Sequence, residues 1–157
     1  MPVDATPPAS PEFTPAFPGY AEKVHQAFAR QGMMQAMQAR LVALSPGRCS
    51  IELPFATAVM QQQAFFHGGA IGALADTACG FAAFTLMPAD AEILTVEYKI
   101  NLVKAARPPL LRADGLVMRA GRTITVCRAE VFRVDGDTRE ICAVMQATMM
   151  RVDPAKA

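Results

Sequence analysis

One apolar stretch, residues 65–84 with the sequence FFHGGAIGALADTACGFAAF, constrains the fold more than any other part of the chain. Its apolar residues recur at helical spacing, which predicts a helix over residues 67–86 with one face in a core. Two glycines stand near its start, although glycine inside a helix costs about 1 kcal/mol relative to alanine. A single carboxylate, Asp76, stands in its middle. The face predicted to be buried consists of Ile71, Leu74, Ala78, Phe81 and Thr85.

The segments around this helix predict an α+β domain. Strand runs near the C-terminal end are separated by two credible tight turns, Ala120-Gly121 and Asp135-Gly136. An order of helix, two strands, long helix and four strands favours one antiparallel sheet laid over the long helix. Besides that long helix, the predicted elements are a helix over 20–37, two strands around the turn SPGR within 39–55, and strands over 92–103, 110–120, 123–134 and 139–152.

The strand over 92–103 alternates apolar and polar residues, which predicts a half-buried strand. Its two faces are predicted to be Leu94, Val96, Tyr98, Ile100 and Leu102 on the buried side, and Thr95, Glu97, Lys99 and Asn101 on the other.

Composition argues against several classes of partner. The chain has 157 residues, of which 52% are hydrophobic and 18% are charged. Its formal net charge is +1 and it has no basic run, so we expect no nucleic-acid partner. No apolar run reaches the roughly 18 residues of a membrane span, so we expect no membrane partner. A flexible Pro-rich tail over 1–19, without the pattern of a signal peptide, is predicted to precede one domain over 20–153. The expected location is cytoplasmic.

The cysteines and histidines predict no metal site. The four cysteines lie far apart without a CxxC pair, and the chain has only two histidines, so no zinc-ligand spacing exists. Free buried thiols in a reducing compartment are a simpler prediction than disulfides. The cysteines are Cys49, Cys79, Cys127 and Cys142.

The start of the long helix predicts a site for a carbonyl oxygen. Its first backbone N–H groups have no partner within the helix, and the helix dipole places partial positive charge there. Because Gly68 and Gly69 lack side chains, a substrate carbonyl could reach these N–H groups, which would stabilise negative charge as an oxyanion hole does. The alternative is structural: His67 caps the helix, and the glycines allow a tight entry.

Asp76 lies among small residues, which would let another helix or a thin ligand approach closely. The alternative is an Asp that faces solvent or bonds to Thr77. At about 1.5 Å per residue, Gly68 and Asp76 lie about 12 Å apart along the axis. If both serve one reaction, Asp76 must therefore act on a carbonyl held by the helix of a second subunit, as in a two-fold dimer. The small residues are Gly69, Gly72, Ala73, Cys79, Gly80 and Ala83.

Several motifs together resemble the hotdog-fold acyl-CoA thioesterases, and most closely the phenylacetate-degradation branch. They are HGG at 67–69 with AD at 75–76, TVEYKIN at 95–101, and GR at 121–122. The resemblance covers roughly residues 30–150. It implies an antiparallel sheet wrapped around one central helix, a homodimer or homotetramer, and hydrolysis of an acyl-CoA thioester to CoA and free acid. No cofactor is implied, since CoA is part of the substrate.

The resemblance also implies roles for individual residues. The Gly68 amide would polarise the thioester carbonyl, and Asp76 would act as nucleophile or as general base. The family's amide side chain before the helix falls on Gln61, and its hydroxyl that positions water or the carboxylate falls on Thr95. His67 would orient these groups. A threonine that one sister branch carries a turn after the acid is replaced here by Gly80.

Binding of CoA requires cations near its phosphates. The candidates are Lys104, Arg107 and Arg122, each of which could instead be an ordinary solvated charge. Backbone around the turn would contact the pantetheine. The remaining residues expected to border the substrate are Gly69, Gly121 and Thr123.

Two alternatives to a thioesterase stay open. An enoyl-CoA hydratase or dehydratase would need a second acid–base group near the helix start, where the sequence offers one acid and one histidine. A non-catalytic acyl-CoA-binding protein would bind the ester without turnover. The sequence does not select among aryl-acetyl, benzoyl and medium-chain acyl groups.

Overall fold

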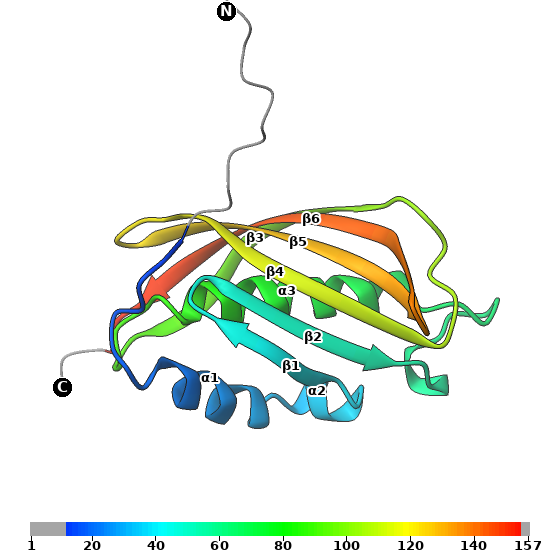
Figure 1. The fold of residues 1–157 in the computed structure, drawn as a ribbon, viewed down its shortest axis with the longest axis horizontal. Coiled ribbons are helices and arrows are strands. Elements are labelled where there is room, and N and C mark those ends of the chain that lie inside the picture. Colours follow the sequence, from blue (N-terminus) through cyan, green and yellow to red (C-terminus); the bar gives the residue numbers. More distant parts are fainter. Residues whose placement is uncertain (1–11, 155–157) are drawn as a thin grey trace, which may run out of the picture.

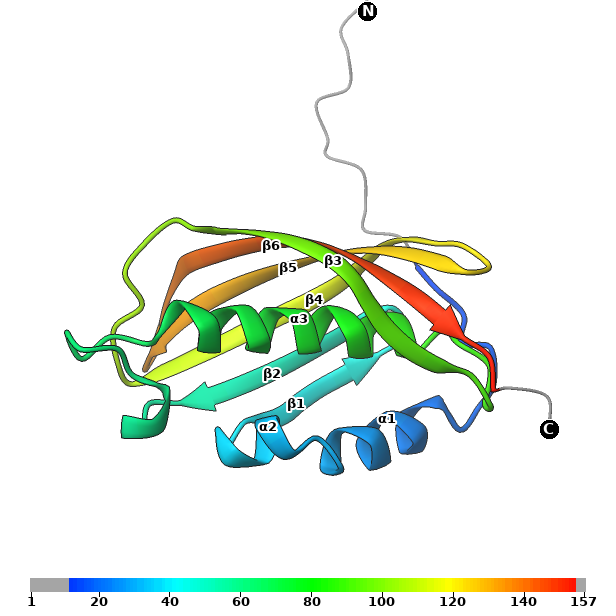
Figure 2. The same ribbon diagram turned by 180° about the vertical axis from the view of Figure 1, so that it is seen from behind.

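The helix predicted from the apolar stretch is the centre of the fold. In the computed structural model, which describes residues 12–154, this helix, α3, spans Gly68–Phe84. It lies against the concave side of a six-stranded antiparallel sheet, which Figures 1 and 2 show from opposite sides. All five residues predicted for the buried face are buried, so the sheet and α3 enclose the core between them.

The strand order in the sheet is β1-β2-β4-β5-β6-β3, and every neighbouring pair is antiparallel. The predicted α+β class, with an antiparallel sheet around one long helix, is confirmed. The remaining elements are α1 (Tyr20–Ala29), α2 (Gly32–Ala36), a short 3-10 helix η1 (Thr57–Val59), β1 (Arg40–Ser45), β2 (Arg48–Pro54), β3 (Glu92–Leu102), β4 (Leu110–Ala120), β5 (Ile124–Asp135) and β6 (Thr138–Val152).

A single glycine sets how closely α3 approaches the sheet. A Cβ atom added at Gly115 of β4 would lie 2.3 Å from the backbone oxygen of Ala78 and 2.8 Å from the backbone nitrogen of Cys79. Real atoms do not approach so closely, so the helix rests on β4 only because residue 115 has no side chain. This contact sets the distance between β4 and the middle of α3, the part of the helix that carries Asp76.

The helix predicted over 20–37 is two helices, so that prediction is wrong. Gln31 is extended (φ −79°, ψ 98°) between α1 and α2. In one continuous helix, Met34 and Met37 would point about 80° and 140° away from Val24 around the axis. The break lets all three side chains be buried, at 0% exposure for Val24, 1% for Met34 and 7% for Met37.

The predicted faces of β3 are confirmed after Val96, where Tyr98, Ile100 and Leu102 share one side, and are wrong before it. Pairing with β6 shifts between Thr95 and Glu97, so Val96 is the extra residue of a β-bulge. Thr95 is paired with Met149 and Tyr98 with Ala147, and both partners are buried. Thr95 before the bulge and Tyr98 after it therefore lie on the same side of the strand, facing α3, instead of on opposite sides.

The prediction that one face of β3 is buried does not hold in the single chain, because β3 is the edge strand of the sheet. Four of its apolar side chains are about half exposed, Leu94 at 57%, Val96 at 53%, Tyr98 at 46% and Leu102 at 54%. A long apolar edge strand with unpaired backbone groups is a surface that another chain can pair with. This edge lies beside α3.

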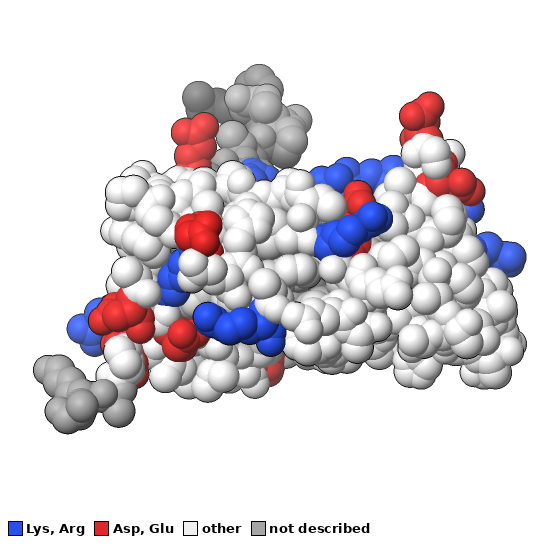
Figure 3. Space-filling view, turned by 90° about the horizontal axis from the view of Figure 1, so that it is seen from below, with Lys and Arg blue, Asp and Glu red and all other residues white. Residues whose placement is uncertain are grey.

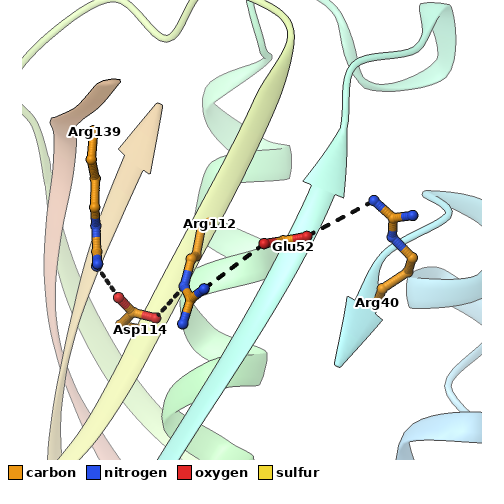
Figure 4. A network of polar contacts seen from close by, with 5 residues as sticks. All are labelled: Arg40, Glu52, Arg112, Asp114 and Arg139. Carbon is orange, nitrogen blue, oxygen red and sulfur yellow. Dashed lines mark hydrogen bonds and ion pairs between the residues drawn. The ribbon is translucent and has the colours of Figure 1, made fainter. Parts of the chain in front are cut away.

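The outer face of the sheet carries a row of alternating charges that runs across β1, β2 and β4 to the start of β6 (Figure 4). Glu52 contacts Arg40 and Arg112, each at 3.9 Å, and Asp114 accepts a hydrogen bond of 2.9 Å from Arg112. Arg139 forms a further ion pair with Asp114. Burial alone would raise the pKa of Asp114, but hydrogen bonds from Ser50 and Arg112 and the nearby arginine charges lower it. The row therefore favours ionised Asp114 in the folded state.

The predicted tail falls mostly outside the described residues, which begin at residue 12. Within the described part, Phe13 packs against the core beside the turn glycine Gly47, whose φ is +74°. Over residues 12–154, none of the helices combines the length and apolar character needed to cross a bilayer. The four cysteines are buried and free.

Candidate active site

The start of α3 combines a capped N–H group with a free one. The Gly69 N–H donates to Nδ1 of His67 at 2.9 Å, so His67 is the N-cap and its Nε2 carries the proton when the ring is neutral. His67 therefore caps the helix start, which is the contact that the structural alternative predicts. The Gly68 N–H has no hydrogen-bond partner among residues 12–154. It is an N–H group available to a ligand.

Gly68 lines a pocket of about 440 Å³ at the helix start. Gln61 lies in the turn before α3, where its backbone N–H donates to Phe65 at 2.8 Å, and it lines the same pocket. Lys104 lines it as well and forms an ion pair with Glu140. Three of the predicted site residues thus meet at one end of α3.

Asp76 lies in a second pocket, of about 100 Å³, near the middle of α3. The Thr95 hydroxyl donates to Oδ1 of Asp76 at 2.9 Å. The bulge at Val96 makes this bond possible, because it turns Thr95 toward the helix. Oδ2 of Asp76 has no hydrogen-bond partner among residues 12–154 and is available to a ligand. The pocket is lined by Gln31, Asp76, Thr77, Gly80, Phe81, Ile93 and Thr95.

The surroundings of Asp76 change its acidity. Burial raises the pKa of Asp76 above its usual value of 3.8, and the hydrogen bond from Thr95 offsets part of that rise. A carboxylate with a raised pKa is a stronger proton acceptor when ionised. Asp76 can therefore act as a base or as a nucleophile in this pocket.

The two pockets are separate within one chain, because they share no residue. α3 passes along β3 between them: a Cβ atom at Gly68 would lie 3.0 Å from Leu102, and one at Gly72 would lie 3.7 Å from the Tyr98 hydroxyl. Of the predicted stripe of small residues, Gly72, Cys79 and Ala83 are buried. Gly69, Ala73 and Gly80 remain accessible on the outward side of the helix.

The other predicted binding residues lie elsewhere. Arg107 stacks on the ring of Phe65, 4.9 Å from its centroid, near the pocket at the helix start. Arg122 and Thr123 follow Gly121 in the turn between β4 and β5 and line a third pocket, of about 290 Å³. Within this turn the Gly121 N–H donates to the backbone oxygen of Ile124 at 2.9 Å. A single chain does not bring this turn together with Gly68.

One polar residue beside Asp76 was not predicted, namely Gln31. It reaches the pocket because the chain breaks between α1 and α2. The signal in the sequence was Gly32, since a glycine inside a predicted helix often marks its interruption.

Within residues 12–154, no group of three or more His, Cys, Asp or Glu side chains is placed to hold a metal ion. The groups that the two pockets bring together are a carboxylate, hydroxyls, amides and a free backbone N–H. These groups can hold a carbonyl oxygen and deliver a nucleophile to its carbon.

Comparison with known proteins shows the family of the chain. Residues 63–140 match the model of the thioesterase superfamily. A thioesterase family protein from Silicibacter pomeroyi, whose crystal structure is known, is 38% identical in sequence to this chain. The alignment covers 86% of this chain and 99% of that chain, and the two structures superpose with a TM-score of 0.84. A Saccharolobus solfataricus protein that carries the provisional name of an esterase is 29% identical over 100 residues, which are 64% of this chain and 71% of that protein.

The PaaI protein of the E. coli phenylacetic acid degradation operon shares the fold. Its sequence is 16% identical, with 85% of this chain and 93% of that chain aligned and a TM-score of 0.76. The central helix and the sheet wrapped around it agree with these relatives, and the family match spans the HGG and AD motifs. The chain belongs to the thioesterase superfamily and has its hotdog fold.

Proposed function

We propose that the protein is an acyl-CoA thioesterase, which hydrolyses an acyl- or aryl-acyl-CoA thioester to CoA and a free acid. The observation that carries this proposal is the Asp76 carboxylate, held by Thr95 at 2.9 Å in a pocket on the outward side of α3. The free N–H of Gly68, at the positive end of the helix dipole, supplies the complementary oxyanion site. Gln61 lines the same pocket as Gly68, and the N–H of its Nε2 that does not bond to Gln63 can donate a second hydrogen bond to the same oxygen.

Each active site is proposed to form between two subunits. Within one chain, Gly68 and Asp76 lie about 12 Å apart along α3, which is too far for both to act on one carbonyl group. If two copies pack with α3 beside α3 in opposite directions, Gly68 of one comes level with Asp76 of the other. Each dimer then holds two equivalent sites.

Two features of the surface support such a dimer. The apolar edge strand β3 is exposed in the single chain and would be covered by β3 of a second copy. The helical side of the molecule, drawn in Figure 3, carries a wide area without charged side chains. Pairs of such dimers would give a homotetramer.

CoA is proposed to lie along the edge of this interface with its phosphates near basic residues. Lys104, Arg107 and Arg122 are all exposed and can reach a phosphate. Lys104 would first have to release Glu140. The free buried thiols support the proposed cytoplasmic location, where cysteines stay reduced.

The test is release of CoA thiol from a panel of aryl-acetyl, benzoyl and medium-chain CoA esters. We expect the wild-type protein to hydrolyse at least one ester, and Asp76→Asn to lose at least about 100-fold in kcat, since it can neither accept a proton nor attack. Asp137→Asn, in the exposed turn between β5 and β6, is the matched control and should keep wild-type activity.

Other outcomes separate the remaining functions. A protein that binds CoA esters tightly and releases no thiol is a binding protein, and the proposed function is then wrong. Addition of water across an enoyl-CoA double bond, with the thioester left intact, would show a hydratase instead. An Asp76→Asn variant with wild-type turnover would leave the thioesterase in place but remove Asp76 from its site.

A further inference from the structure

The break between α1 and α2 leaves one amide free beside Asp76. The backbone N–H of Gln31 donates to Phe28 at 3.0 Å, and its backbone oxygen accepts from the N–H of Gln35 at 3.1 Å. The Gln35 side-chain amide is also engaged, by the backbone oxygen of Ala29. The Gln31 side-chain amide, in contrast, has no hydrogen-bond partner among residues 12–154, and Gln31 lines the pocket of Asp76. It is therefore available to a molecule in that pocket.

The same pocket contains unfilled space next to Gly80. A Cβ atom added at Gly80, one helical turn after Asp76, would have no other atom within 4 Å. Thr77 and Thr95 also line the pocket, so four of its seven lining residues carry polar side chains. A volume of about 100 Å³ with several polar partners is sufficient for bound water.

We propose that this space holds the water that attacks the thioester, and that Gln31 is a positioning residue for that water. The inference rests on the proposed thioesterase function. Oδ2 of Asp76 accepts one hydrogen of the water, and Oε1 of Gln31 accepts the other. With both hydrogens held, a lone pair of the water oxygen is left to point at the thioester carbon.

The chemical step follows from this arrangement. One O–H bond of the water breaks and its proton passes to Asp76, while the oxygen forms a bond to the carbonyl carbon. The C–S bond then breaks, its electron pair goes to sulfur, and the proton held by Asp76 passes to the thiolate. The products are the free acid and CoA thiol. Asp76 is the general base, and Gln31 touches only the water.

Methanol offers a test that separates positioning from folding. Methanol has a single O–H, which Asp76 can accept, and its methyl group takes the place of the hydrogen that Gln31 holds. In wild-type enzyme with a good ester and a fixed methanol concentration, the products are the free acid and the methyl ester. In Gln31→Leu, hydrolysis should fall about fivefold to tenfold, because one hydrogen bond to the water is lost.

Methyl ester formation should fall much less in Gln31→Leu, so the ratio of ester to acid rises severalfold while the KM for the acyl-CoA stays the same. Gln26→Leu is the matched control, because the Gln26 amide lies on the exposed side of α1 and bonds to Glu22 at 2.7 Å. It should leave both products unchanged.

Gly80→Ala should lower the ratio of ester to acid, whereas Gln31→Leu should raise it. Its methyl group occupies the open space without a clash, and alanine favours the helix over glycine. Ester formation should therefore fall more than acid formation, because methanol is the larger acceptor. A lower ratio of ester to acid in a variant at least as stable as the wild type would place the acceptor beside Gly80.

Three results would overturn the inference. They are an unchanged ratio of ester to acid in Gln31→Leu with wild-type hydrolysis, an equal loss of both products in that variant, and an unchanged ratio in Gly80→Ala. All three results would leave the proposed thioesterase function unaffected. A wild-type protein that releases no CoA from any ester overturns the proposed function together with the role of Gln31.

Discussion

The contact between Gly115 and α3 makes a quantitative prediction for the substitution Gly115→Ala. The added Cβ would lie 2.3 Å from the Ala78 oxygen, whereas ordinary contacts begin at 3.4 Å. The neighbour is helix backbone and not the end of a flexible side chain. α3 must therefore move about 1 Å away from β4, or β4 must bend outward by the same distance.

The expected cost follows from this displacement. Inserting a methyl group into a packed core costs about 1 to 3 kcal/mol, and the rigid neighbour places this site near the upper end. For a domain of this size the corresponding fall in Tm is about 10 °C. Because the same movement shifts Asp76 relative to Thr95, a misplacement of about 1 Å should also lower kcat by up to about 100-fold.

Thermal unfolding at a fixed protomer concentration measures the stability change, and CoA release measures the activity. Gly32→Ala is the matched control, because a Cβ atom there meets no atom within 4 Å. It should leave both quantities at wild-type values. If Gly115→Ala unfolds within about 2 °C of the wild type and turns over normally, the helix does not rest on β4 at residue 115.

Two further predictions concern titrating groups. Burial raises the pKa of Asp76 and the hydrogen bond from Thr95 lowers it, so Thr95→Val should raise that pKa further and move the acid limb of the kcat/KM profile to higher pH. A limb that stays in place or moves to lower pH would contradict the pairing of these two residues. Asp114 has a lowered pKa in the folded state, so its ionised form stabilises the fold above its unfolded value of about 3.9, and this contribution is lost as the pH falls through the folded value. Asp114→Asn should therefore cost about 1 kcal/mol of unfolding free energy at pH 7, and the difference should shrink at a pH below that unfolded value in denaturant titrations. An equal cost at both pH values would assign the effect to packing instead of charge.

Local patterns in the sequence were sufficient to predict α3 and the hairpins. The buried face of α3 follows from helical spacing alone, and the turns at Gly47 and Gly136 both have the positive φ that glycine accepts, at +74° and +56°. The family resemblance placed Asp76 with Thr95 and Gly68 with Gln61. The structure brings each of these pairs into one pocket.

Features set by distant partners could not be predicted from local patterns. The bulge at Val96 depends on how β3 pairs with β6, and it reverses the alternation that the sequence of β3 suggests. The break before Gly32 lets Met34 and Met37 be buried together with Val24 of α1. Gln31 reaches the pocket of Asp76 only as a result of that break.

The central claim, that Asp76 of one subunit acts with the Gly68 N–H of the other, can be tested by mixing two inactive variants. Gly68→Pro removes the N–H group. Proline is accepted at the first residue of a helix, and His67 already has the extended conformation (φ −67°, ψ 137°) that a residue before proline needs. Gly68→Ala keeps the N–H, with its Cβ 3.0 Å from Leu102, and is the steric control.

The most direct measurement is the activity of a heterodimer with Asp76→Asn in one subunit and Gly68→Pro in the other, purified through two different affinity tags. Each variant alone should be inactive. The heterodimer contains one site with both wild-type groups, so it should turn over at about half the wild-type rate per dimer. A heterodimer as inactive as its parents, when Gly68→Ala is active, would show that the two groups do not meet across the subunit interface.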